Sequence, residues 1–159
     1  MTYGRIAAAL SAALTLPLAA HTPARADTDP FFSYDRPATY GVRTERVSVP
    51  LRDGGHLACD LHRPDAAGRF PVIVYDYNAY DQLAALGQSA AYFVSRGYNA
   101  AVCNVRGSGD SPGRLDPFSG QEQRDNYDLI EWLGIQPWST GKVGQTGVSY
   151  GGHSSSSSR

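Results

Sequence analysis

The chain has 159 residues, a length that fits one domain. Its 14 Lys and Arg residues and 15 Asp and Glu residues leave a formal net charge of −1, and this balance argues against a nucleic-acid partner. Hydrophobic residues make up 42% of the chain, which is enough to form a core.

The first 26 residues have the pattern of a secretory signal peptide. Arg5 is the only charged side chain before an apolar run over residues 6–20, and Ala24-Arg25-Ala26 supplies an A-x-A cleavage site. The alternative is a transmembrane anchor, but the apolar run is short and Pro17 interrupts it. We therefore expect a signal peptide over residues 1–26, secretion to the periplasm or the medium, and no stable membrane anchor.

A hairpin is predicted near the start of the mature chain. Residues 27–41 are rich in aromatic residues and proline without periodicity, and we expect a lead-in segment there. Residues 42–50 alternate as a strand does, Asp53-Gly54-Gly55 forms a tight turn, and residues 56–62 form a second strand.

Strands and helices then alternate along the chain. Short continuous apolar runs at 71–75 and 100–105 indicate strands buried on both faces, and apolar residues at helical spacing indicate the helices. The elements expected are strands at 71–75, 100–105 and 143–146 and helices at 83–96 and 121–133. This order predicts the front half of an α/β fold, with a largely parallel sheet preceded by the β-hairpin.

The two cysteines lie in apolar, strand-like runs. A buried free cysteine behaves as a small hydrophobic residue, so we favour two free thiols at Cys59 and Cys103. Export permits a disulfide as the alternative, provided that the two strands are neighbours with suitable geometry.

The most informative motif is G-x-S-x-G at Gly147-Val148-Ser149-Tyr150-Gly151, directly after the strand predicted at 143–146. In α/β-hydrolases the nucleophilic serine occupies a strained turn between a strand and a helix, and the two glycines let strand and helix cross closely. The alternative is a chance glycine-rich turn. The preceding strand favours Ser149 as a nucleophile.

An oxyanion hole needs two donors beside such a serine. The backbone N–H of Tyr150 is one, because the residue after the nucleophile supplies it in this fold. The second comes from the loop after the first central strand, where the phenol of Tyr80 is a candidate. From the spacing alone, an ordinary packing role for Tyr80 is favoured.

The general base is missing from the sequence pattern. Along the chain of this fold the triad runs Ser, then Asp or Glu, then His. The only histidine after Ser149 is His153, and four residues further along a helix its ring cannot turn back onto the serine hydroxyl. We interpret His56 and His62 as exposed hairpin residues. Residues 154–159, mostly serine, read as a disordered low-complexity tail. We therefore expect a partial domain over residues 42–153, truncated after the nucleophile turn, and poor stability.

The glycine-rich loop over residues 107–113 allows a nucleotide-binding interpretation. Its spacing departs from G-x-G-x-x-G, Pro112 removes an amide donor, and there is no G-K-[ST]. A structural turn above the sheet is the favoured interpretation.

Several spaced segments resemble one family. Residues 104–113 look like its VRGTG-x-S-x-G segment, residues 127–133 resemble its YD-x-x-EW helix, and residues 136–151 are similar to its QPWS-x-GKVG…G-x-SY-x-G. Together they resemble the CocE/NonD hydrolases of the X-Pro dipeptidyl-peptidase-like (S15) group, from about Val42 to Gly152.

This resemblance implies an α/β-hydrolase with a Ser-Asp-His triad that cleaves esters or amides without a cofactor, with Ser149 as nucleophile. Residues 78–81 fall where the family has N-P-Y-D, whose tyrosine gives an oxyanion-hole hydroxyl, and this favours that role for Tyr80. Ala79 replaces the family's proline. The family's triad Asp and His, helical cap and C-terminal β-rich domain have no counterpart after Gly152.

Two functions remain open at this stage. The leading hypothesis is the N-terminal fragment of a secreted serine hydrolase for small-molecule ester, amide or peptide substrates, inactive without the missing triad residues. The alternative is a non-catalytic hydrolase-like fragment or binding module.

Overall fold

The structure is a computed structural model that describes residues 35–156. The predicted signal peptide and most of the predicted lead-in segment lie outside the described residues, as do residues 157–159. The elements are, in chain order, β1 (Val42–Pro50), β2 (His56–Pro64), β3 (Phe70–Asn78), α1 (Leu83–Val94), β4 (Asn99–Asn104), α2 (Gly120–Ile135), β5 (Ser139–Gln145) and α3 (Tyr150–Ser156).

The hairpin, the three later strands and the two helices predicted from the sequence are all present, with boundaries shifted by a few residues. Helix α1 ends before Gly97, which has a φ of 82° that suits glycine. Helix α2 begins at a side-chain cap, because the hydroxyl of Ser119 accepts a hydrogen bond from the backbone N–H of Glu122 at 3.2 Å. Among residues 35–156, no helix has the length and apolar character needed to span a bilayer.

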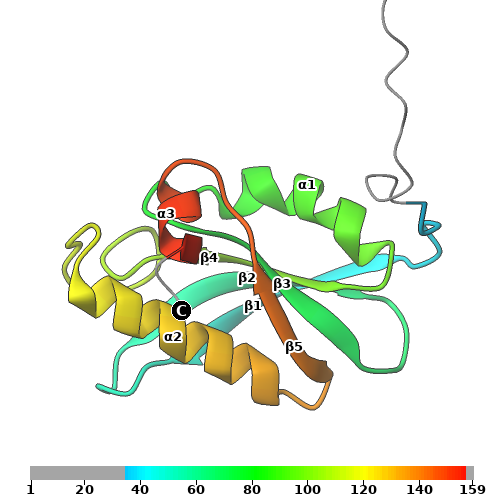
Figure 1. Cartoon of the computed structure of the whole chain (residues 1–159), viewed down its shortest axis with the longest axis horizontal. Helices are drawn as coiled ribbons and strands as arrows, with labels where there is room; N and C mark the ends of the chain where they lie inside the picture. The colour runs from blue at the N-terminus through cyan, green and yellow to red at the C-terminus, as the bar shows by residue number, and fades with distance from the viewer. Residues whose placement is uncertain (1–34, 157–159) are drawn as a thin grey trace, which may run out of the picture. The chain divides into compact units, whose positions relative to one another are not determined.

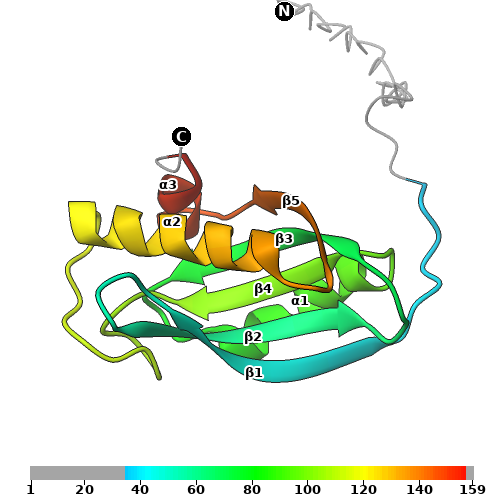
Figure 2. The same ribbon diagram turned by 90° about the horizontal axis from the view of Figure 1, so that it is seen from below.

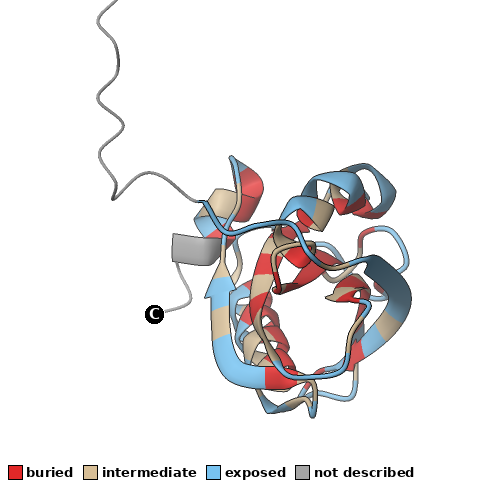
Figure 3. Cartoon of the chain, turned by 90° about the vertical axis from the view of Figure 1, so that its right-hand side faces the viewer, coloured by how far each residue is buried: buried red, intermediate tan, exposed pale blue. Residues whose placement is uncertain are grey.

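The strands form one mixed sheet in the order β1-β2-β4-β3-β5. Strands β4, β3 and β5 are parallel, while β2 pairs antiparallel with both β1 and β4. The hairpin thus precedes the parallel strands in the sequence, as predicted, and extends the sheet beside β4. Strand β5 is at one edge, and Figure 3 shows that exposed residues dominate both edge strands, β1 and β5.

The helices cover both faces of this sheet. Helix α1 packs on one face, and α2 and α3 lie together on the other (Figures 1 and 2). Two buried cores result. The larger one, on the α2 side, centres on Leu57, Val74, Tyr77, Leu129 and Leu133. The smaller one, under α1, consists of Leu83, Ala90, Val94, Ala100 and Val102. This arrangement is the α/β layering that the sequence predicts.

The preference for free thiols is wrong. Cys59 of β2 and Cys103 of β4 face each other in the antiparallel register, with their Cα atoms 4.1 Å apart, and they form a disulfide within the larger core. No free cysteine occurs in the described part of the chain. The sequence showed two apolar strands but not that they are neighbours, and neighbouring strands are what the bond requires.

The first serines of the tail are helical, contrary to expectation. Helix α3 continues to Ser156, and the side chain of Ser154 is buried, only 3% exposed. Its hydroxyl donates to a carboxylate oxygen of Glu122 at 3.3 Å and lies 3.4 Å from the carbonyl oxygen of Tyr150. These partners in the interior offset the weak helix propensity of serine.

Candidate active site

Ser149 lies at a sharp turn between β5 and α3. Strand β5 ends at Gln145 and α3 begins at Tyr150, so the strand–turn–helix context expected for the motif is present. Ser149 is exposed and has a φ of 57°, a left-handed conformation that costs a non-glycine residue free energy. The carbonyl oxygen of Ser149 accepts from the N–H of His153 at 3.0 Å, which joins the turn to the helix.

The motif glycines are required by close backbone approach. A Cβ atom on Gly147 would lie 2.3 Å from the carbonyl carbon of Gly151, which is shorter than any tolerable contact. A Cβ on Gly151 would lie 2.4 Å from Oδ1 of Asp76. Both glycines therefore let the turn fold tightly over the end of β3, as the sequence predicts.

Two hollows adjoin Ser149, and Tyr80 and Tyr150 line both. The first, of about 330 Å³, also contains Asp76, Asn78 and Leu86 of α1 in its wall. The second, of about 470 Å³, is bounded by Phe118 and His153. All three residues predicted from the sequence to form the site therefore line the same two hollows.

The loop after β3 presents Tyr80 at this opening. The side-chain oxygen of Asn78 accepts from the backbone N–H of Tyr80 at 2.8 Å, which closes a tight turn. The Tyr80 side chain is 62% exposed, and its ring lies edge-on to the ring of Tyr150, with centroids 5.9 Å apart. Asp81 has a φ of 51° and accepts from the Asn104 amide at 2.9 Å, so β4 supports the same turn.

Glu122 at the start of α2 anchors the Tyr150 side chain. The Tyr150 hydroxyl donates to Oε2 of Glu122 at 2.5 Å, and the backbone N–H of Phe118 donates to the same oxygen at 3.2 Å. Burial, followed by the hydrogen bond to Glu122, raises the pKa of Tyr150 above its usual value. The Tyr150 hydroxyl is therefore a neutral donor that ties α3 to α2.

Asp76 is a buried carboxyl group in the wall of the first hollow. Its side chain accepts a short hydrogen bond from the amide of Asn78, and the residue is 6% exposed. Burial raises the pKa of Asp76 to about 6, although the backbone N–H of Tyr77 favours the ionised form. This group therefore titrates in a range where an exposed aspartate is fully ionised.

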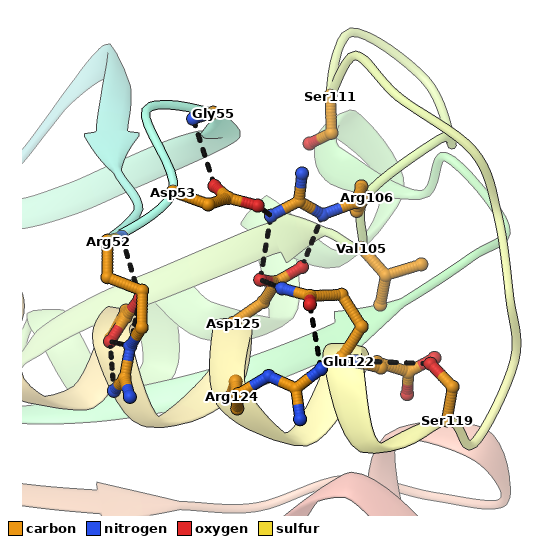
Figure 4. A network of polar contacts seen from close by, with 12 residues as sticks. Arg52, Asp53, Gly55, Val105, Arg106, Ser111, Ser119, Glu122, Arg124 and Asp125 are labelled. Carbon is orange, nitrogen blue, oxygen red and sulfur yellow. Dashed lines mark hydrogen bonds and ion pairs between the residues drawn. The ribbon is translucent and has the colours of Figure 1, made fainter.

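The glycine-rich loop after β4 is a structural turn, as expected. Ser111 fixes it, because its hydroxyl accepts from the N–H of Ala58 at 2.9 Å and donates to the carbonyl oxygen of Asn104 at 2.8 Å. Arg106 at its start forms ion pairs with Asp125 of α2 and with Asp53 of the hairpin turn (Figure 4). This loop therefore joins the hairpin, β4 and α2.

The histidines are distributed away from a triad arrangement. His153 is exposed on α3 with its ring 4.7 Å from that of Phe118, and His56 is exposed at the start of β2. The prediction that His62 is exposed is wrong, because it is 6% exposed and packs against Gly87 of α1. Burial lowers its pKa. Within residues 35–156 the Ser149 hydroxyl has no hydrogen-bond partner, and no group of three or more His, Cys, Asp or Glu side chains could hold a metal ion.

Comparison with known proteins decides the family. The family model of the X-Pro dipeptidyl-peptidase (S15 family) matches residues 53–157. The chain belongs to this family. Cocaine esterase of Rhodococcus sp. (strain MB1 Bresler) is 41% identical to it over an alignment of 108 residues, which covers 65% of this chain and 19% of that protein. The chain thus spans about a fifth of the length of that relative.

Solved structures agree with this family assignment and with the α/β-hydrolase fold. A CocE/NonD family hydrolase from Staphylococcus aureus matches with a TM-score of 0.60 at 27% identity, covering 71% of this chain and 27% of that one. An α-amino acid ester hydrolase matches with a TM-score of 0.60 at 26% identity, covering 88% of this chain and 25% of that one. The CocE/NonD resemblance drawn from the sequence is therefore confirmed.

Three residues of this S15-family site escaped the sequence analysis. Asp76 directly follows the apolar run at 71–75, so the sequence placed it just after the strand. A carboxylate next to such a run is itself a signal of a perturbed pKa. Glu122 has the spacing of a capping box with Ser119, but its link to Tyr150 needs the tertiary fold. Phe118, with a φ of 60°, had no signal in the sequence.

Proposed function

We propose that this chain carries the nucleophile and oxyanion hole of a secreted serine hydrolase that cleaves ester or amide bonds through an acyl-enzyme. The observation that carries the proposal is the strained, exposed Ser149 at a strand–turn–helix junction, with Tyr80 and Tyr150 lining the same opening. Membership of the S15 family and 41% identity to a cocaine esterase support hydrolase chemistry.

The proposed roles follow from the chemistry of acyl transfer. The hydroxyl oxygen of Ser149 attacks the substrate carbonyl, and its proton passes to a general base. The carbonyl oxygen becomes an oxyanion, which the backbone N–H of Tyr150 and the phenol of Tyr80 stabilise by hydrogen bonds. Expulsion of the alcohol or amine leaves an acyl group on Ser149, and water then removes it.

The base is the missing part of this proposal. No histidine among residues 35–156 bonds to the Ser149 hydroxyl, and an unassisted serine hydroxyl is a weak nucleophile at neutral pH. We propose that the 159-residue chain by itself is nearly inert. The Cys59–Cys103 disulfide supports the proposal of export, because such bonds persist in oxidising compartments.

An external base tests the proposal directly. Imidazole added to the chain can accept the Ser149 proton, so p-nitrophenolate release from p-nitrophenyl acetate should exceed the rate of the Ser149→Ala variant under the same conditions. That variant corrects for hydrolysis by imidazole itself. Tyr80→Phe should lower the Ser149-dependent rate by roughly 10²–10³-fold, the loss expected for one oxyanion donor.

A matched control is Tyr92→Phe, which removes the hydroxyl of another exposed tyrosine, on α1. Its rate should equal that of the unaltered chain. Equal rates for the unaltered chain and Ser149→Ala at every imidazole concentration would instead favour the non-catalytic alternative.

A further inference from the structure

Asp76 is a buried carboxyl group to which the proposed chemistry assigns no role. It lies near the end of β3, is 6% exposed, and lines the same hollow as Ser149 and Tyr80. A buried carboxyl group costs folding free energy unless its oxygens are satisfied. Its contacts therefore indicate what it does.

One side of the Asp76 carboxyl group holds the Tyr80 loop. Its Oδ2 accepts the amide N–H of Asn78, which fixes the orientation of that amide. The other end of the same amide, Oδ1 of Asn78, then faces the backbone N–H of Tyr80 and accepts it at 2.8 Å. The turn that carries the Tyr80 phenol is thus connected to Asp76 through one side chain.

The other side of the carboxyl group supports the serine turn. Oδ1 of Asp76 occupies the space directly beside Gly151, where even a Cβ atom would lie 2.4 Å away. Gly151 follows Tyr150, whose N–H is the second proposed donor. The same carboxyl group therefore contacts both segments that supply the oxyanion hole, although these are more than sixty residues apart along the chain.

We propose that Asp76 is a positioning residue that keeps the Tyr80 loop and the first turn of α3 in register, so that the two oxyanion donors converge. This inference rests on the proposed function for its catalytic consequence. Positioning requires an acceptor oxygen on a side chain of this size. It does not require negative charge, which would oppose the developing oxyanion. Asparagine, which keeps the acceptor and the size, should therefore replace Asp76.

Amide hydrogen exchange tests the positioning role in the 159-residue chain without any need for catalysis. In Asp76→Ala, the Tyr80 amide should exchange about 10-fold faster, because the Asn78 side chain is no longer held in place. In Asp76→Asn, exchange should stay within about twofold of the unaltered chain. Asp65→Ala, which removes an exposed carboxylate from the loop before β3, at the opposite end of that strand from Tyr80, should leave the Tyr80 exchange rate unchanged.

A second variant keeps the test decisive if Asp76→Ala fails to fold. Asn78→Ala removes only the link to Tyr80, so Tyr80 exchange should accelerate while the amides of the first turn of α3 keep their rates. Unchanged Tyr80 exchange in both alanine variants, or an Asp76→Asn variant that exchanges as fast as Asp76→Ala, would overturn the inference.

The imidazole-assisted reaction separates this inference from the proposed function. Asp76→Ala should lower the Ser149-dependent rate about 10-fold or more, and Asp76→Asn should restore it. A Ser149-dependent rate that is indifferent to Asp76 would overturn the positioning role alone. A rate that does not depend on Ser149 would overturn the proposed function and leave the exchange result to stand by itself.

Discussion

Arg106 and Asp125 form a bidentate ion pair that joins the loop after β4 to the buried side of α2 (Figure 4). The Nε and Nη2 atoms of Arg106 donate to the two carboxylate oxygens at 2.8 and 2.9 Å, and the Asp125 side chain is only 1% exposed. The hydrogen bond to Asp125 is the largest cause that raises the pKa of Arg106 further above its usual value, so the guanidinium stays charged. Asp53 of the hairpin turn also pairs with Arg106, with its Oδ2 2.8 Å from Nη2 of the guanidinium.

Removing Arg106 should destabilise the fold strongly. Arg106→Ala leaves the Asp125 carboxylate buried with only the Gln121 amide as a side-chain partner, so we expect a loss of about 3 kcal/mol in the free energy of unfolding. Urea denaturation measures it. The control is Arg52→Ala, because the side chain of Arg52 is 51% exposed in its pair with Asp128. This substitution should lower the free energy of unfolding by less than about 1 kcal/mol. Equal losses in the two variants would contradict the assigned role of Arg106.

The Cys59–Cys103 disulfide should stabilise the chain by closing a long loop. The cysteines are 44 residues apart, and a loop of that length corresponds to about 4 kcal/mol in the chain-entropy estimate. The double variant Cys59→Ala/Cys103→Ala, unfolded in urea without reductant, measures the loss. Thiol titration of the unfolded chain gives an independent check, and two free thiols in protein purified without reductant would disprove the bond.

The close approach at the serine turn predicts a sharp contrast between two glycines. Gly147→Ala forces a Cβ atom into the backbone of Gly151, so the turn must open and the protein should lose both stability and any Ser149-dependent reaction. Gly144→Ala, three residues earlier in β5, places its Cβ in open space and should behave as the unaltered chain does. Thermal unfolding of the two variants compares them, and a fully tolerated Gly147→Ala would show that the turn is looser than described.

Asp76 should make stability fall as the pH rises toward neutrality. Its folded-state pKa of about 6 lies above the ordinary value of 3.8, so between these values the folded state binds more protons than the unfolded one. Stability from this group is therefore present at low pH and is lost as pH rises through about 6. Asp76→Asn does not titrate, and its free energy of unfolding relative to the unaltered chain should increase over that window.

His62 acts in the opposite direction, since its lowered pKa makes stability fall as the pH drops below 6.5. Both proteins contain His62, so the difference between them isolates Asp76. A difference in unfolding free energy that stays constant from about pH 4 to pH 8 would refute the pKa assigned to Asp76.

The sequence predicts the individual elements better than their contacts. Apolar runs located β3 and β4, the central strands that are mostly buried on both faces, and the G-x-S-x-G motif located the turn at Ser149 after the polar edge strand β5. The strand order is a tertiary property, so neither the Cys59–Cys103 pairing nor the burial of His62 beneath α1 could be derived from local pattern.

The same limit explains what was missed at the site. Helix α3 was unexpected because serine alone does not favour a helix, whereas the buried partners of Ser154 come from α2. Tyr80 and Tyr150 were identified by motif, but the carboxyl groups that hold their segments, Asp76 and Glu122, act across elements. Local sequence patterns do not predict residues whose roles depend on contacts between distant elements.

Covalent labelling of Ser149 tests the central claim most directly. A fluorophosphonate probe should leave the 159-residue chain unlabelled at neutral pH, because no histidine among residues 35–156 bonds to the Ser149 hydroxyl, and should label it at Ser149 when imidazole is present. Peptide mass spectrometry locates the adduct, and Ser149→Ala should show none. Stoichiometric labelling without imidazole would contradict the proposed inertness of the chain, and equal labelling of Ser149→Ala would contradict the role of Ser149 as the nucleophile.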